Sequence, residues 1–213
     1  MQDLFDYNIA SEMLKLLIAT NNPGKMAEIK ALLSEQNIEL VAPAQMGLEL
    51  DVPEDGQSYA ENALLKGRAY TRMSGLVTLA DDSGLEVDAL EGRPGLHSAR
   101  YVDRPGATDS DRRQRLLEQL MVKTRPWTAR FRCWVAIVAP DGEAQLAEGI
   151  CEGEIIPEER GYNGFGYDPI FLIPEMEKTM AELSMAEKNR LSHRARAVKA
   201  ALPLIAKYQI KAD

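Results

Sequence analysis

The stretch LLIATNNPGKMAEI, residues 16–29, places a lysine at the end of a short turn between an apolar run and an amphipathic run. A helix that starts at such a turn offers unpaired N–H groups to an anion, and Lys25 adds a positive charge beside them. Thr20 and Asn22 add donors, so the turn is suited to binding phosphate. It is not a Walker loop, because GxxxxGK[ST] needs more glycines and a hydroxyl after the lysine. The alternative is an ordinary strand-to-helix turn with a solvated Lys25.

Carboxylates form a second candidate group, in which Asp81 and Asp82 directly follow the apolar run 77–80 and Glu54 lies upstream. Adjacent carboxylates at a strand end repel each other unless a cation or a shared proton intervenes. Mg²⁺ is the simplest such cation, because it needs only one or two protein carboxylates when phosphates and waters complete its coordination. The alternative is that Asp82 and Ser83 only form an Asx-type turn.

An aromatic loop follows later in the chain, at GFGYDP, residues 164–169. Phe165 and Tyr167 alternate with glycines, and Asp168 precedes a proline that keeps it extended. Flexible backbone beside an aromatic face can hold a nucleobase, with Phe165 stacking on the base and polar groups reading its edges. The alternative is that both aromatic side chains pack in the core.

The segment AEKNRLSHRARAVK, residues 186–199, concentrates positive charge in a chain whose formal net charge is −8. Such a run is usually a solvated helix face and less often a nucleic-acid patch. Ser192 can cap a new helix, however, which leaves His193 and Arg194 in its first turn. Positive charge is unfavourable there because the helix N-terminus is itself positive, so an anion or an acceptor-rich ligand would relieve the conflict.

These residues need a framework of strands and helices, which the apolar periodicity supplies. The expected strands are 14–20, 77–80, the segment LEVDAL after a turn at Gly84, and 131–137, which leads to a hairpin at Asp141-Gly142. The expected helices are 24–36, 57–73, 108–123 and a closing helix through Leu191 and Ile205 that Pro203 should kink or end. Residues 157–169 are expected to be a loop. We predict a mixed sheet flanked by helices, with residues 14–213 as a single domain and residues 1–13 as an extension.

Composition limits the classes of partner. With 33 acidic against 25 basic side chains, the protein is not expected to bind nucleic acid or an anionic membrane, because both attract basic surfaces. No apolar run approaches the roughly 20 residues that span a bilayer. Two cysteines and the lack of a secretory pattern in residues 1–13 indicate a reduced, cytoplasmic location.

Taken together and in order, the motifs ATNNPGK, DDSGLEVDAL-EGRPG-SARY, GFGYDPIF and AEL-EKNRLSHR resemble the inosine triphosphate pyrophosphatase family. The similarity runs from about residue 15 to about residue 202. It implies a Mg²⁺-dependent homodimer with an elongated mixed α/β fold, in which the active cleft lies between two lobes. It also implies that ITP, dITP or XTP is hydrolysed to the nucleoside monophosphate and pyrophosphate.

The resemblance also assigns roles to single residues. It makes Asp82 the proton acceptor and a metal ligand together with Glu54, and it makes Ser83 a substrate contact. The other substrate-binding positions are Thr20, Asn21, Asn22, Gly24 and Lys25 in the phosphate loop, Phe165, Gly166, Tyr167 and Asp168 in the aromatic loop, and Lys188, His193 and Arg194. Asn21 stands where many relatives have Gly or Ser, and Tyr167 where some have Trp. The segment VDRPGATD after SARY departs more clearly.

In chemical terms, we expect Asp82, alone or with Asp81, to activate a water while Lys25 and the loop amides hold the β and γ phosphates. Donors from His193, Arg194 or loop amides would favour a base with an acceptor at position 6. A non-catalytic nucleotide sensor is disfavoured because it needs no water-activating carboxylate. An RNA-binding protein that uses residues 188–199 is disfavoured by the net charge.

Overall fold

The computed structural model describes residues 13–210, and within them seven strands form one mixed sheet in the order β2-β1-β3-β4-β5-β6-β7. β1 is parallel to β2 and β3, and the later neighbours in the sheet are antiparallel. The strands are β1 (Leu14–Ile18), β2 (Ile38–Val41), β3 (Val77–Val87), β4 (Trp127–Val138), β5 (Ala144–Ile155), β6 (Phe171–Ile173) and β7 (Lys178–Thr179). The predicted extension lies outside the described residues except for its last residue, Met13.

Polar cap residues explain where the helices begin. The side chains of Asn22, Ser58, Thr108 and Ser184 each accept a hydrogen bond from a backbone N–H in the first turn of α1, α2, α3 and α4. The α-helices are α1 (Pro23–Leu33), α2 (Tyr59–Ser74), α3 (Asp109–Leu120), α4 (Met185–Leu191) and α5 (His193–Ile210). The 3₁₀ helices are η1 (Pro43–Met46), η2 (Asp88–Leu90), η3 (Gly95–Arg100), η4 (Asp168–Ile170), η5 (Pro174–Met176) and η6 (Met180–Glu182).

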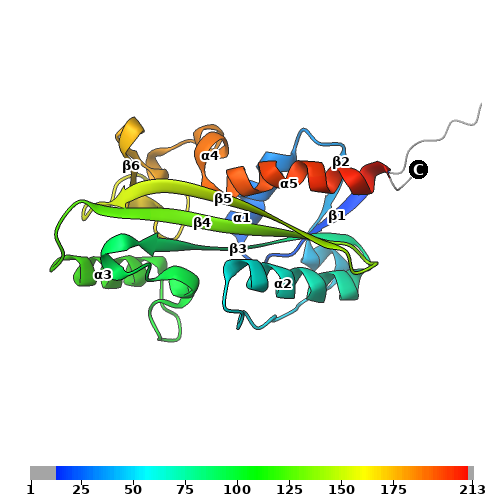
Figure 1. Ribbon diagram of the computed structural model, residues 1–213, viewed down its shortest axis with the longest axis horizontal. Helices are drawn as coiled ribbons and strands as arrows, with labels where there is room; N and C mark the ends of the chain where they lie inside the picture. Colours follow the sequence, from blue (N-terminus) through cyan, green and yellow to red (C-terminus); the bar gives the residue numbers. More distant parts are fainter. Residues whose placement is uncertain (1–12, 211–213) are drawn as a thin grey trace, which may run out of the picture.

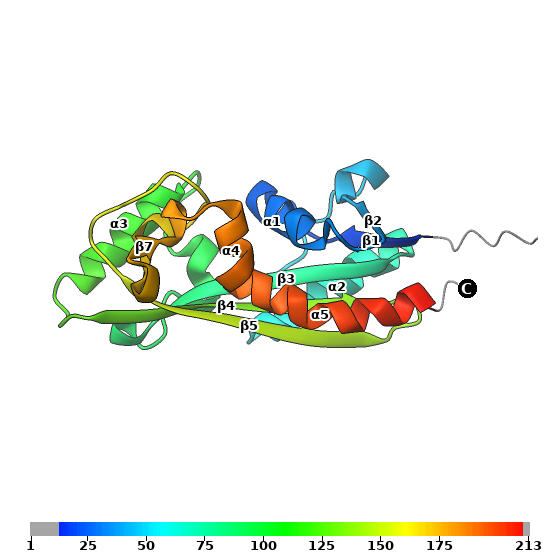
Figure 2. The ribbon, with the colours of Figure 1, turned by 90° about the horizontal axis from the view of Figure 1, so that it is seen from above.

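The molecule is elongated because β3, β4 and β5 run along its length (Figure 1). At one end, α2 packs against Ala136 and Val138 while α5 packs on the opposite face against Val135 and Ile137, as the alternation of a strand requires. At the other end, α3 shares a second core with β6 and the ends of the long strands. Figure 2 shows α3 and β7 at this end, away from β1, β2 and α2, with α4 nearer the middle of the molecule. The predicted α/β fold with two lobes is confirmed.

One prediction about the sheet is wrong. Residues 77–90 were expected to contain a strand, a turn at Gly84 and a second strand, but β3 is continuous and pairs with β4 from Thr78 to Val87. Gly84 serves close packing instead of a turn. A Cβ atom there would lie 2.4 Å from the carbonyl oxygen of Gly95 and 2.8 Å from Oγ of Ser98. The polar sequence DDSG is therefore the buried middle of a long strand.

The closing helix also differs from the prediction, because α5 continues through Pro203 to Ile210. Proline cannot donate a backbone hydrogen bond to the residue four positions earlier, which is Lys199. Both Pro203 and Lys199 are exposed, so water can satisfy the free carbonyl group. None of the helices within residues 13–210 is both long and apolar enough to cross a membrane.

Candidate active site

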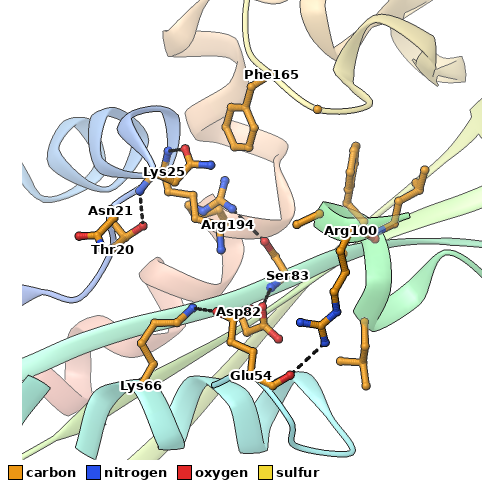
Figure 3. A pocket seen from close by; sticks show the side chains of 18 of the residues that line it. Thr20, Asn21, Lys25, Glu54, Lys66, Asp82, Ser83, Arg100, Phe165 and Arg194 are labelled. Atoms are coloured by element: carbon orange, nitrogen blue, oxygen red, sulfur yellow. Dashed lines mark hydrogen bonds and ion pairs between the residues drawn. The ribbon is translucent and has the colours of Figure 1, made fainter. Parts of the chain in front are cut away.

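A cleft lies beside the edge of the sheet at which β1 ends. β1 pairs with β3 only as far as Ile18 opposite Leu79, so β3 has no strand partner on that side from Ala80 onward. The cleft beside this open edge has a volume of about 560 Å³, which is typical of a small-molecule site. Its walls come from the loops after β1 and before α2, from η3, from the loop before η4, and from α4 and α5 (Figure 3).

The cleft brings the predicted site residues together, although they come from five separate segments of the chain. Gly24 is the exception, because it does not line the cleft. A Cβ atom at Gly24 would lie 2.5 Å from Cδ1 of Phe165, so this glycine lets the aromatic ring pack on the start of α1. The predicted residues that line the cleft are Thr20, Asn21, Asn22, Lys25, Glu54, Asp82, Ser83, Phe165, Gly166, Tyr167, Asp168, Lys188, His193 and Arg194.

The loop between β1 and α1 is held in shape by its own side chains. The amide of Asn22 donates to Oγ1 of Thr20 (3.1 Å), and the amide of Lys25 donates to Oδ1 of Asn22 (3.0 Å). These two amides already have acceptors, so the donors left for a ligand at this helix start are the side chains and the amides that have none. The ammonium of Lys25 is the strongest of them because it carries a full charge.

Asp82 points from the middle of β3 toward α2 and the cleft. Its Oδ2 accepts a hydrogen bond from Nδ2 of Asn62 (3.0 Å), and its Oδ1 accepts one from the amide of Ser83 (2.9 Å). The side chain is only 7% exposed. Burial, with a smaller contribution from Glu54, raises the pKa of Asp82 against the opposing effects of Lys25, Lys66 and Asn62. A carboxylate with a raised pKa beside a cleft can accept a proton from a bound water.

Asp81 points to the opposite face of β3 and does not line the cleft. Its Oδ2 lies 3.1 Å from Nζ of Lys25 and 3.2 Å from Nε of Arg194. Burial favours the neutral acid, but the charges of Lys25, Arg194 and Lys66 outweigh burial and lower the pKa of Asp81. Asp81 is therefore a permanent anion that orients two cations, which separates its role from that of Asp82.

Glu54 reaches the cleft from the loop before α2, where its carboxylate forms an ion pair with Lys66. Nζ of Lys66 also donates to the carbonyl oxygen of Asp81 (3.1 Å), so Lys66 links this loop to β3. Within residues 13–210 there is no group of three His, Cys, Asp or Glu side chains arranged to hold a metal ion. Asp82 and Glu54 thus offer at most the one or two carboxylates that Mg²⁺ needs when phosphates and waters supply its other ligands.

The positive charges of Lys188 on α4 and Arg194 on α5 are neutralised inside the protein, which corrects the expectation that an anion or acceptor-rich ligand would relieve the charge at this helix start. Nζ of Lys188 lies 2.6 Å from Oε1 of Glu28 and 3.0 Å from Oδ2 of Asp168. Arg194, 1% exposed, pairs with Glu28 and Asp81 and donates to Oγ of Ser83 (3.0 Å). Burial would raise the pKa of Glu28, but Arg194 and Lys188 lower it. This buried network fixes the floor of the cleft.

His193 lies within the same network but carries no charge near neutral pH. Its ring stacks on Phe131 with 4.7 Å between ring centroids, and its Nδ1 is buried without a hydrogen-bond partner. Burial, followed by the nearby charges of Arg194 and Lys188, holds the pKa of His193 well below its usual range. A neutral imidazole that lines a cleft can offer either a donor or an acceptor to a ligand.

The two aromatic residues of the 164–169 loop have different surroundings. Phe165 is half-buried over the cleft, and Nζ of Lys188 and Cζ of Arg194 lie 5.8 Å and 5.7 Å from its ring centroid. Tyr167 is buried in the second core, and its hydroxyl donates to the carbonyl oxygen of Ser98 (2.9 Å). The core-packing alternative therefore holds for Tyr167, whereas Phe165 retains a face that a ligand can use.

The cleft and its immediate support include residues that the sequence motifs did not single out: Glu28 and Lys66 line the cleft, and Asn62 contacts Asp82. Asn62 and Lys66 lie on the buried face of α2, together with Ala63 and Tyr70 at helical spacing. Glu28 follows Lys25 by three residues, so both lie on one face of α1. A polar residue on the apolar face of a predicted helix is the signal that could have identified all three. Two further cations line the cleft: Arg100, which lies in the quoted motif SARY without an assigned role, and Arg112.

Fold and cleft together define a two-lobed α/β protein with a charged pocket at the open edge of a mixed sheet. The chain belongs to the Ham1 family, whose sequence model matches residues 16–204. It is 45% identical to a dITP/XTP pyrophosphatase from Desulforamulus reducens over 90% of this chain and 96% of the relative. It is 48% identical to a dITP/XTP pyrophosphatase from Methylococcus capsulatus over 86% and 92% of the two chains.

Solved structures agree with this assignment. A HAM1 protein from Coxiella burnetii is 38% identical and superposes with a TM-score of 0.82, covering 92% of this chain and all of that one. A dITP/XTP pyrophosphatase from Mycobacterium abscessus is 43% identical with a TM-score of 0.70, covering 89% of this chain and all of that one. The family resemblance that the four motifs indicate is thereby confirmed.

Proposed function

We propose that this protein hydrolyses ITP, dITP and XTP at the bond between the α and β phosphates, releasing the nucleoside monophosphate and pyrophosphate. Membership of the Ham1 family and the names of its relatives support the substrate class. The observation that carries the reaction is electrostatic. Asp82 and Lys25 both line the cleft, so a carboxylate and a cation face one site, and burial raises the pKa of that carboxylate.

In this reaction Asp82 orients a water and accepts its proton as the water attacks the α phosphorus. The bond from the α phosphorus to the bridging oxygen breaks, and pyrophosphate leaves with that oxygen. Lys25 and Lys66 lie where negative charge on the leaving group must be stabilised. Asp82 and Glu54 would hold Mg²⁺, which neutralises phosphate charge when it is bound.

Recognition of the base is assigned to the other end of the cleft. Phe165 stacks on the purine, while Asp168, Lys188, His193 and Arg194 surround it. Hypoxanthine and xanthine carry an acceptor at position 6, where adenine carries an amino donor. A buried site built for one hydrogen-bond pattern can reject the other by about 10⁴-fold, because mismatched polar groups stay unpaired.

Pyrophosphate release from a panel of nucleotides tests the function directly. ITP, dITP and XTP should be cleaved in the presence of Mg²⁺, with ATP and GTP at least about 10²-fold slower in kcat/KM. Chelation of the metal with EDTA should abolish turnover, and added Mg²⁺ should restore it. Comparable rates on all common triphosphates would contradict the proposed selectivity, and tight ITP binding without product would indicate a sensor.

The variant Asp82→Asn tests the assigned base. It removes the proton acceptor but keeps the shape of the side chain, so we expect kcat to fall by about 10³-fold or more while the thermal unfolding midpoint changes little. Asp55→Asn is the matched control, because Asp55 is exposed in the neighbouring loop. Near-normal turnover in Asp82→Asn would remove this carboxylate from the mechanism.

We also propose that the protein is a homodimer in the cytoplasm. Sedimentation velocity over a range of protein concentrations tests whether the protein is a dimer. Cell fractionation tests whether it is in the cytoplasm.

A further inference from the structure

Arg100, the last residue of η3, reaches across the cleft from the second lobe to the first. Its Nη2 donates to the carbonyl oxygen of Glu54 (3.0 Å), and its Nε donates to Nδ1 of His97 (3.3 Å). Figure 3 shows the guanidinium beside Glu54 and Asp82, at the end of the cleft away from Phe165. The side chain is exposed, so a ligand can reach it.

Arg100 differs from the other cations of the cleft in its charge balance. Each of the others has a carboxylate within ion-pair distance; these are Lys25, Lys66, Arg112, Lys188 and Arg194. Arg100 has no carboxylate partner among the residues that the structure describes, and its two acceptors are a carbonyl oxygen and an imidazole nitrogen. Its positive charge is therefore uncompensated at the rim of the cleft.

The geometry of the guanidinium also leaves donors free. Arginine has five N–H donors in a planar fork, and the carbonyl of Glu54 and the ring of His97 take one each. The remaining donors have no protein acceptor within residues 13–210. A guanidinium with free donors and unbalanced charge is well suited to bidentate contact with phosphate oxygens.

We propose that Arg100 is a phosphate-binding residue that contacts the β and γ phosphates of the substrate and the pyrophosphate that leaves. This inference rests on the proposed function, because it assigns one group within the same site. When the bond between the α phosphorus and the bridging oxygen breaks, negative charge grows on the β phosphate, and Arg100 stabilises it from the side opposite Lys25. Arg100 also contacts the loop that carries Glu54, through the carbonyl oxygen of that residue.

The test compares Arg100→Gln and Arg100→Lys with Arg104→Gln. Arg104 follows four residues later, is exposed, pairs with Asp111 and does not line the cleft, so it is a matched control. We expect kcat/KM for ITP to fall by about 10²-fold or more in Arg100→Gln, to recover in part in Arg100→Lys, and to stay within about twofold of wild type in Arg104→Gln.

Product inhibition separates phosphate binding from a structural role. In Arg100→Gln the inhibition constant for pyrophosphate should rise about tenfold or more, whereas that for inosine monophosphate should stay within about twofold of wild type. Equal kcat/KM in the Arg100→Gln and Arg104→Gln variants would overturn the inference. The inference would also be overturned if Arg100→Gln lost activity and needed more Mg²⁺ while its inhibition constant for pyrophosphate stayed unchanged. Arg100 would then only hold the loop that carries Glu54. If the wild-type protein did not cleave ITP, the proposed function itself would fail.

Discussion

The residues around Asp82 set the environment of its carboxylate, and Asn62 is the most direct of these. Asn62 is 1% exposed, donates to Oδ2 of Asp82 through Nδ2, and accepts from the amide of Gly56 (2.9 Å) through Oδ1. One amide side chain thus fixes both the carboxylate and the loop that carries Glu54. Because its two ends are satisfied by different partners, the orientation of Asn62 is determined.

Replacing Asn62 with Ala should change the pH dependence of the reaction. The hydrogen bond from Asn62 stabilises the ionised form of Asp82, so its loss raises the pKa of Asp82 further. The acidic limb of the profile of kcat/KM against pH should move to higher pH, and kcat at neutral pH should fall by about tenfold or more. Asn37→Ala, at an exposed residue, is the control; a profile that coincides with it would show that Asn62 does not position Asp82.

Single residues of the site were predictable where a local motif carried them. Lys25 follows a turn and precedes a helix, and Asp82 lies in a recognisable family motif, so neighbouring residues are enough to single them out. Glu28 lies in no such motif, and its partners Lys188 and Arg194 lie 160 and 166 positions further along the chain. The positive charges of Lys188 and Arg194 are evident from the sequence, but the carboxylates that neutralise them come close only in the tertiary structure.

The start of α1 and the 164–169 loop meet at the contact between Gly24 and Phe165. Gly24 lies in a helical turn, where Ala would ordinarily stabilise the helix by up to about 1 kcal/mol. The added methyl group would instead collide with the ring of Phe165, which must move. The contact therefore couples the phosphate loop to the residue assigned to the base.

Gly24→Ala should weaken substrate binding without unfolding the protein. Stacking of a base on an aromatic ring is worth about 1–3 kcal/mol, so displacement of Phe165 should raise KM for ITP about tenfold while the unfolding midpoint stays equal or rises. Combining Gly24→Ala with Phe165→Ala makes the control, since the methyl group then has no ring to displace. Purely additive effects in this double-mutant cycle would contradict the coupling.

The elements show where local sequence is a sufficient guide and where it is not. The caps at Ser58 and Thr108 and the Asp141-Gly142 hairpin depend on neighbouring residues, and all three were predictable. The segment 81–84 has the composition of a turn, but β4 pairs along it and α2 and α5 cover its two faces. Tertiary contacts decided the structure of this segment, as they did for the passage of α5 through Pro203.

Over the whole molecule, the two lobes share three long strands, and buried charge holds the segments around the cleft together. Glu28 on α1 pairs with Lys188 on α4 and Arg194 on α5, and Asp168 joins them from the second lobe. Breaking a buried pair leaves an uncompensated charge and usually costs about 3–5 kcal/mol. This network makes the shape of the cleft dependent on the folding of the entire chain, so the site cannot form from one lobe alone.

The stability of the molecule as a whole should fall between pH 6.5 and pH 5 because of His193. Well above pH 6.5 the ring is neutral in the folded and unfolded states and has no effect on the balance between them. Below that pH His193 binds a proton in the unfolded chain but not in the folded protein, so the free energy of unfolding decreases by at most about 1.4 kcal/mol per pH unit.

Chemical denaturation at several pH values measures this effect, and the free energy of unfolding should change less steeply with pH in His193→Gln than in wild type. His97→Gln is the matched control, because His97 is exposed and is the one other histidine in the chain. Carboxylates contribute equally to all three proteins, so identical slopes would show that His193 titrates normally in the fold.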